Sequence, residues 1–357
     1  MILIRNEFDF LNEYGISSND LYKCQQSFEK TLNYLKFHKV RNGLNKSKSL
    51  LEITFSSNFC QNYHNELLNR IEVLNAFNIE KHYTPIFITA TLDSQYRDFL
   101  FADYSNLKAS DLISIPKHIK EKINQKLALT IVDLKDILNQ KLKIFNNFYN
   151  RKYKAYKIKY CKVFEPHKKL GVPHLHMVLF IPNNAEIIED FKNAYMRLFP
   201  APQNLRTDKL TLKQKQNGEL NGFQTSINNS IAYIMKYLQK TFLNLKHNDI
   251  NNIKIDKLTA WYIKHKIRRF TMSRFLVPLW LYRKLNFIPS LRDYFHLNNE
   301  LEKHNNILEK DYKNNKFFIH IETTNQTIIY ENKHLIYESN NRIINEYKSD
   351  FEFFKVA

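Results

Sequence analysis

The sequence predicts an α+β protein in which helical regions flank a β-sheet core and a small β-meander lies near the carboxyl terminus. Residues 1–80 carry apolar positions at helical spacing behind Ser, Asn and Asp start signals. Residues 154–164 alternate in polarity and lead, through a stretch of Pro, Gly and charge, into a strand that opens at His174. Residues 316–347 alternate again in short runs. These three patterns indicate helices, a hairpin and a meander.

The chain divides by pattern into four segments. They are a helical region (1–80), a core (81–245), a helical and basic region (246–315) and a β-rich tail (316–357). We find no internal repeat and no low-complexity linker, so composition does not mark the boundaries.

The predicted core begins with a buried strand over residues 83–92. A long helix is expected over residues 116–148, starting at Pro116, because apolar residues recur every three or four positions. A half-buried strand (154–164), the hairpin turn, and a crossover helix (185–199) follow. Residues 205–224 then indicate a weak strand or ribbon, and residues 231–242 a further helix.

Charge favours a polyanionic partner. The 357 residues include 54 Lys and Arg against 35 Asp and Glu, a formal net charge of +19. No apolar run approaches the roughly 20 residues that span a bilayer, and the amino terminus acquires acids too early for a secretory signal. We therefore expect a soluble protein of the bacterial cytoplasm with no membrane partner.

Cysteine and glycine usage exclude two kinds of site. Cys24, Cys60 and Cys161 lie far apart and form no C-x-x-C pair, so we expect reduced thiols. The five glycines cannot form a G-x-x-x-x-G-K-[ST] phosphate loop. Any unwinding of duplex DNA must come from another protein.

A candidate metal site lies on the predicted hairpin. His174 and His176 share one face of a strand, because side chains alternate with a period of two. The hairpin would bring Glu165 near them, and a carboxylate with two neutral imidazoles can hold a divalent cation with positions left for substrate. An H-x-H alone more often faces solvent. His167, in the turn, fits a solvated loop better than a further ligand.

The helix predicted over residues 231–242 has one polar stripe. Helical spacing places Tyr233, Lys236, Tyr237 and Lys240 on that stripe, and Ile231, Met235, Leu238 and Phe242 opposite. A tyrosine oxygen there could attack a phosphodiester and retain the phosphoryl group, with lysines stabilising the charge that develops. The plainer interpretation is the wet face of an ordinary amphipathic helix.

Two acid-free stretches mix cations with aromatic residues. They lie between Asp136 and Glu165 and from Lys257 to Arg292. Cations contact phosphates and rings stack on unpaired bases, so the mixture favours single-stranded DNA, although about half of the rings are expected in the core. The candidate DNA-binding residues are Lys154, Lys157, Lys159, Arg268 and Arg269.

These motifs together resemble the HUH endonuclease superfamily, and within it the gene-A-type rolling-circle replication initiators of phages and related plasmid Rep proteins. The resemblance spans residues 83–285. It rests on "EPHKKLGVPHLHMVLF", on "YIMKYLQK", on the strand "FITATL" and on the later "AWYIKHKIRRFTMS". The turn "HKKLGVPH" departs from the acidic or Asp-Gly turn common in that family, which puts the role of this loop in doubt.

The resemblance implies a ferredoxin-like, RRM-like antiparallel sheet with the histidines on a central strand and the tyrosine helix packed across it. It assigns Glu165, His174 and His176 to Mg²⁺ or Mn²⁺, and Tyr233 and Tyr237, aided by Lys236 and Lys240, to catalysis. It further implies nicking and rejoining of single-stranded DNA at a replication origin through a 5′-phosphotyrosine. The free 3′-hydroxyl would serve the host DNA polymerase, and a host helicase would supply the unwinding.

Two alternatives remain open from the sequence. Two-tyrosine rolling-circle transposases keep the same order of motifs, and flanking genes and terminal DNA elements would distinguish them. A non-catalytic origin-binding or architectural protein would bind DNA by charge alone. Such a protein would shift DNA without forming a covalent adduct.

Overall fold

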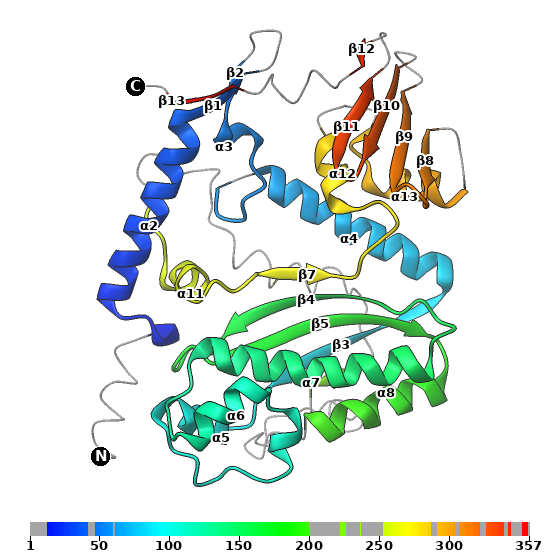
Figure 1. Ribbon diagram of the computed structural model, residues 1–357. Helices are drawn as coiled ribbons and strands as arrows, with labels where there is room; N and C mark the ends of the chain where they lie inside the picture. Colours follow the sequence, from blue (N-terminus) through cyan, green and yellow to red (C-terminus); the bar gives the residue numbers. More distant parts are fainter. Residues whose placement is uncertain are drawn as a thin grey trace. The chain divides into compact units, whose positions relative to one another are not determined.

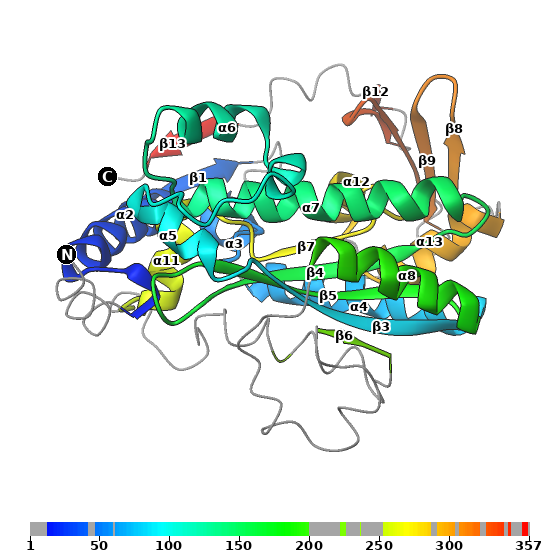
Figure 2. The same ribbon diagram turned by 90° about the horizontal axis from the view of Figure 1, so that it is seen from below.

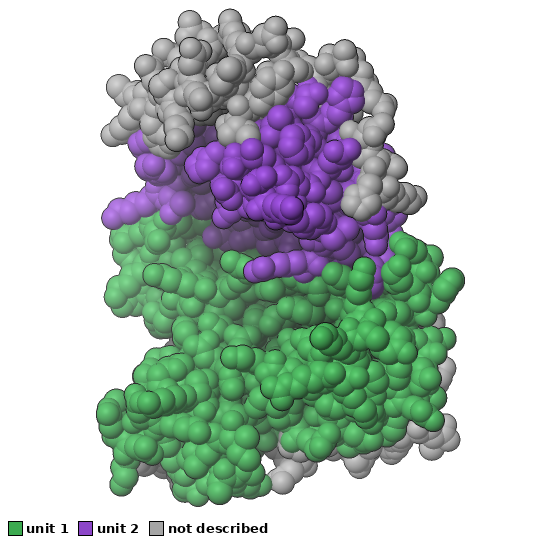
Figure 3. Space-filling view, turned by 45° about the vertical axis from the view of Figure 1, so that its right-hand side comes forward, with its two compact units in different colours: residues 1–28, 78–273 green, residues 29–77, 274–357 purple. Residues whose placement is uncertain are grey.

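The computed structural model describes residues 13–41, 47–59, 61–199, 222–225, 236, 253–286, 291–303, 307–321, 326–338, 342–343 and 352–355. The chain forms two compact units (Figure 3), one of residues 1–28 and 78–273 and the other of residues 29–77 and 274–357. Each unit combines separate parts of the sequence. The division into four consecutive segments stays a prediction.

Unit 1 is built on a five-stranded sheet in the order β6-β3-β5-β4-β7, antiparallel at every pairing. The strands are β3 (Tyr83–Thr91), β4 (Lys159–Pro166), β5 (Pro173–Pro182), β6 (Phe223–Gln224) and β7 (Phe270–Met272). The predicted α+β class is confirmed, and so is the hairpin, which β4 and β5 form. The ferredoxin-like arrangement stays a prediction.

The central strand β5 is buried on both faces, which explains its almost continuous apolar sequence. Helices α7 (Ile131–Lys152) and α8 (Ala185–Leu198) cover one face of the sheet (Figures 1 and 2). Phe145 of α7 and Phe191 of α8 are fully buried, with ring centroids 5.9 Å apart. This layer leaves the opposite face of β5 to carry His174 and His176.

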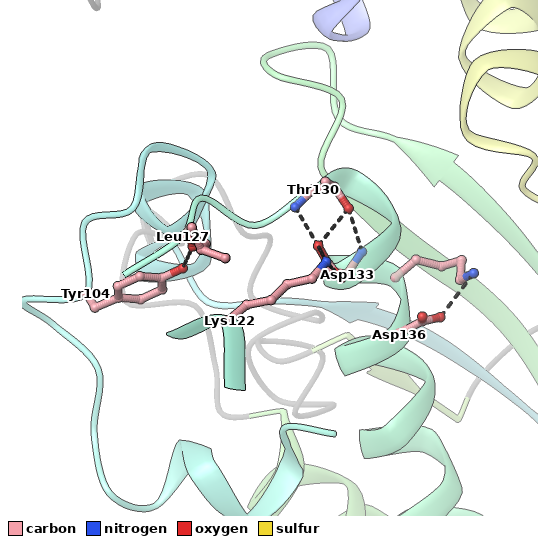
Figure 4. A network of polar contacts seen from close by, with 7 residues as sticks. Tyr104, Lys122, Leu127, Thr130, Asp133 and Asp136 are labelled. Atoms are coloured by element: carbon pink, nitrogen blue, oxygen red, sulfur yellow. Dashed lines mark hydrogen bonds and ion pairs between the residues drawn. The ribbon is translucent and has the colours of Figure 1, made fainter. Parts of the chain in front are cut away.

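The single long helix expected over residues 116–148 is wrong. The chain instead forms α6 (Lys117–Asn124) and α7, separated by a turn in which Lys126 has a φ of 53°. Figure 4 shows the cause, a capping box in which Thr130 Oγ1 accepts from the Asp133 amide at 3.2 Å and Asp133 Oδ2 accepts from the Thr130 amide at 2.8 Å. Lys122 Nζ bonds the same carboxylate at 2.8 Å. The box starts a new helix where periodicity alone continues the old one.

The strand expected to begin at residue 154 begins only at Lys159. Residues before it turn, with the Tyr156 amide donating to the Tyr153 carbonyl at 2.9 Å. Both faces of β4 are then covered, because Val163 is buried on the side that carries Glu165 and Phe164 is buried on the other. The predicted half-buried pattern therefore applies to neither face of the strand.

Further elements of unit 1 lie around the sheet. They are η1 (Glu13–Gly15), α5 (Gln95–Asp98), η2 (Phe99–Phe101), η3 (Asp111–Ser114) and α11 (Lys257–His265). Residues 246–315 are thus not helical throughout, because β7 within them joins the sheet beside β4. Cys24 and Cys161 are buried thiols, and Cys60 lies outside the described residues.

Unit 2 contains a second five-stranded antiparallel sheet, in which β8 to β12 are neighbours in chain order. Its strands are β8 (Leu308–Asp311), β9 (Lys316–Ile321), β10 (Gln326–Glu331), β11 (His334–Glu338) and β12 (Arg342–Ile343). Helices α12 (Leu279–Leu285) and α13 (Tyr294–Lys303) contribute Leu281 and Leu297 to the same core as Ile319. The predicted meander is confirmed.

The remaining elements of unit 2 include a small sheet in the order β13-β1-β2. They are β1 (His38–Arg41), β2 (Ser47–Ser49), α3 (Leu50–Ile53) and β13 (Glu352–Lys355). The predicted helical region 1–80 thus also contains two strands. Helices α2 (Ser18–Phe37) and α4 (Gln61–Lys81) contain the boundaries between the units. None of the described helices has the length and apolar content that a bilayer span requires.

Candidate metal centre

The β4–β5 hairpin brings Glu165, His174 and His176 together. Glu165 pairs with His174 across the two strands, and Val163 pairs with His176, so all three candidate side chains lie on one face. Glu165 Oε2 lies 3.0 Å from His176 Nε2 and 3.4 Å from His174 Nε2. One ligand atom from each of the three residues lies within 4.8 Å of the others. The convergence expected from the sequence is present.

The spacing suits a small divalent cation. Two ligand atoms that lie about 2.1 Å from one ion at right angles are about 3.0 Å apart, the separation that Mg²⁺ geometry requires. The distances from Glu165 Oε2 to the two histidine nitrogens, 3.0 and 3.4 Å, are close to this value. The carboxylate and imidazole donors accept Mg²⁺ or Mn²⁺ equally, so the donor set does not select the metal.

The second nitrogen of each imidazole also bears on a metal. His176 Nδ1 lies 3.3 Å from Thr89 Oγ1, and the ring stacks on Phe87 with centroids 5.7 Å apart. A proton on Nδ1 would leave Nε2 as a lone pair facing Glu165, which is the form that binds a cation. His174 Nδ1 is buried and has no hydrogen-bond partner among the residues that the structure describes.

Thr89 was not among the residues singled out from the sequence. Its signal is the alternation of Thr89 and Thr91 in β3, with the same period of two as the histidine pair. Thr89 pairs with His176 and Thr91 with His174 across the strands. The hydroxyls of β3 therefore lie beside the imidazoles of β5.

Charge at the centre favours an ionised carboxylate. Burial raises the pKa of Glu165, but the hydrogen bonds and positive charges of His174 and His176 outweigh burial and hold this pKa well below its ordinary value. Burial, with the positive charges of His174 and Arg97, lowers the pKa of His167 to about 4. The His167 ring is half-buried, 4.7 Å from that of His174, so the expectation of a solvated loop histidine is wrong.

The candidate catalytic helix lies almost wholly outside the described residues. Tyr233, Tyr237 and Lys240 are among the residues that the structure does not describe. Lys236 is helical and exposed, as the predicted polar stripe requires of it. Catalysis by the two tyrosines and two lysines stays a prediction.

The candidate DNA-binding residues differ in exposure. Lys154, Lys157 and Arg268 are exposed and Lys159 is half-buried. Arg269 is only 2% exposed, and its guanidinium lies 4.8 Å from the centre of the Tyr262 ring. Arg269 thus packs inside unit 1, where a phosphate would reach it only after a change in packing.

One comparison with known proteins finds a match. Residues 124–242 match the family of the replication-associated protein ORF2. The matched stretch covers about a third of the chain and contains Glu165, His174 and His176. Comparison with curated proteins and with solved structures finds nothing similar. The candidate metal centre thus lies in a stretch that is similar to a replication-associated family.

Proposed function

We propose that the protein is a metal-dependent, sequence-specific endonuclease and ligase for single-stranded DNA that nicks a replication origin and initiates rolling-circle replication. The observation that carries the proposal is the convergence of Glu165, His174 and His176 on one face of the β4–β5 hairpin. This convergence occurs within the stretch that is similar to a replication-associated family. We assign the antiparallel sheet, with its histidines on the central strand, to a ferredoxin-like HUH core.

The proposed reaction is a transesterification at phosphorus. An oxygen of Tyr233 or Tyr237 attacks the scissile phosphate, its bond to phosphorus forms, and the bond from phosphorus to the 3′ oxygen breaks. The phenol loses its proton to solvent, and the leaving oxygen takes up one to become a 3′-hydroxyl. The DNA 5′ end remains on the tyrosine, and attack by a 3′-hydroxyl reverses the step and rejoins the strand.

The chain's own residues divide the remaining tasks. Glu165, His174 and His176 would hold Mg²⁺ or Mn²⁺, and such an ion polarises a phosphoryl oxygen when bound. Lys236 and Lys240 would stabilise the phenolate and the charge that develops on the phosphoryl group. Exposed cations such as Lys154 and Arg268 would contact DNA phosphates outside the reacting linkage.

The test is a covalent adduct. The protein is incubated with Mn²⁺ and single-stranded oligonucleotides that tile the replicon encoding it, and protein–DNA species that survive denaturation are counted. We expect an adduct with the wild-type protein and none with Tyr233→Phe/Tyr237→Phe. His174→Ala and His176→Ala should each abolish cleavage while retaining DNA binding.

Two results would contradict the proposal. Nicking by the double tyrosine variant would remove the nucleophile assignment, and unchanged cleavage by either histidine variant would remove the metal assignment. A wild-type protein that shifts DNA but never forms an adduct would favour the non-catalytic alternative.

A further inference from the structure

We propose that residues of η1 and α11 brace the turn of the metal-binding hairpin, and that Tyr262 and Trp261 are positioning residues for the metal centre. The inference rests on the proposed metal site. It assigns a role to two segments that lie outside the matched stretch, one near the amino terminus and one beyond residue 242.

The turn between β4 and β5 is held from both segments. The Tyr14 amide of η1 donates to the Lys168 carbonyl at 2.7 Å. Trp261 Nε1 of α11 donates to the Gly171 carbonyl at 2.9 Å, and Trp261 is fully buried. In Figure 1, α11 lies beside the end of the sheet at which β4 leads into β5. The turn is therefore an interior feature of unit 1.

The contact between η1 and the turn is close enough to exclude side chains. Gly171 has a φ of +68°, and a Cβ there would lie 2.2 Å from the Tyr14 carbonyl oxygen. Gly15 has a φ of +66°, and a Cβ there would lie 2.7 Å from the Leu170 carbonyl oxygen. Both positions need glycine for conformation and for space. The two backbones pack directly on each other.

A second set of contacts fixes the peptide that leads into Glu165. Tyr262 donates its hydroxyl proton to the Phe164 carbonyl at 2.5 Å, and the Phe164 amide donates to the Arg269 carbonyl at 3.3 Å. The Phe164 carbonyl belongs to the peptide bond joining Phe164 to Glu165. Because Tyr262 is 4% exposed, water does not compete freely for this hydrogen bond.

These contacts matter because the ligands lie near the open end of the hairpin ladder. The pair Glu165 and His174 is followed only by Pro166 and Pro173 before the turn. Prolines donate no ladder hydrogen bond, and ladder ends fray most readily. Fraying would separate Glu165 from His174, whereas His176 lies deeper in the strand. The brace would hold the carboxylate and the first imidazole at metal-binding distance.

The test compares two matched tyrosines in the full-length protein. Tyr262→Phe removes the hydroxyl that contacts Phe164. Tyr294→Phe removes an equivalent buried hydroxyl in unit 2, which donates to the Val277 carbonyl at 2.6 Å from a residue that is also 4% exposed. Mn²⁺ affinity is measured by electron paramagnetic resonance, and thermal stability by circular dichroism.

We expect Tyr262→Phe to weaken Mn²⁺ binding roughly three- to tenfold, the effect of losing one buried hydrogen bond that orders a ligand. Tyr294→Phe should lower the melting temperature similarly and leave Mn²⁺ affinity unchanged. Trp261→Phe, which keeps an aromatic ring and loses the N–H, should behave like Tyr262→Phe and replaces it if that variant does not fold.

The outcomes separate this inference from the proposed function. Wild-type affinity in both brace variants, or an equal loss in Tyr294→Phe, would overturn the brace while leaving the metal site intact. A wild-type protein that binds no Mn²⁺ would overturn the metal site and the brace together.

Discussion

Each imidazole of the candidate centre has two nitrogens, and in both rings Nε2 turns toward Glu165. In His176 the other nitrogen meets a hydroxyl of β3, Thr89 Oγ1, at 3.3 Å. This contact decides which nitrogen carries the proton, and therefore whether His176 presents a lone pair or a proton to the carboxylate. The properties of the centre depend on the neighbours of its ligands.

Thr89→Val tests this dependence, because valine keeps the branched shape that suits a strand and removes only the hydroxyl. We expect Mn²⁺ affinity to fall roughly tenfold, as for other residues that orient metal ligands. Isothermal titration calorimetry measures the affinity. Thr91→Val is the control, since Thr91 pairs with His174 across the strands and has no contact with an imidazole nitrogen among the described residues. Unchanged binding in Thr89→Val would show that the hydroxyl does not orient His176.

The pH dependence of stability should include a contribution from His265 in α11. Burial and the positive charge of Lys264 outweigh Asp20 and lower the pKa of His265 to about 4, against 6.5 for an ordinary histidine. Between these values the unfolded chain binds more protons than the folded one, so the free energy of unfolding falls as pH drops from 6.5 toward 4. Above pH 6.5 this contribution is fully present.

His265→Gln should therefore reduce the loss of stability between pH 7 and pH 5, measured by urea unfolding with the metal chelated. His118→Gln is a suitable control, because His118 is exposed on α6. If His265→Gln loses as much stability over this range as the wild-type protein, burial does not disfavour the charged form of His265.

At the scale of elements, local rules predict some boundaries and miss others. The hairpin follows from alternation and turn composition within residues 154–182, so the contact of Glu165 with the histidines is predictable. The break between α6 and α7 is not visible in the apolar period, because Leu127 and Leu129 continue it through the turn. Its signal is the Thr130-x-x-Asp133 pattern, which competes with the longer helix.

Thr130→Ala should lower the free energy of unfolding of unit 1 by about 1 kcal/mol, because the amides at the start of α7 lose their side-chain acceptor. Thr130→Ser keeps the hydroxyl and should retain most of the stability. Urea unfolding followed by circular dichroism measures both variants. Equal losses in the two variants would assign the effect to packing of the methyl group instead of to the cap.

At the scale of the whole molecule, each unit draws on distant parts of the chain. The contacts of Thr89 with His176, of Trp261 with Gly171 and of Tyr262 with Phe164 join residues separated by 87, 90 and 98 positions. Periodicity and motif spacing hold no information at this range. The sequence therefore identifies the metal ligands but not the residues that orient them.

The central claim is that Glu165, His174 and His176 bind one divalent cation. Crystals of the protein soaked in MnCl₂ test it most directly through an anomalous difference map at a wavelength above the manganese edge energy. The account predicts a strong peak in contact with Glu165 Oε2 and both Nε2 atoms, and its loss in His176→Ala. Manganese bound elsewhere, with no density between these three side chains, would contradict it.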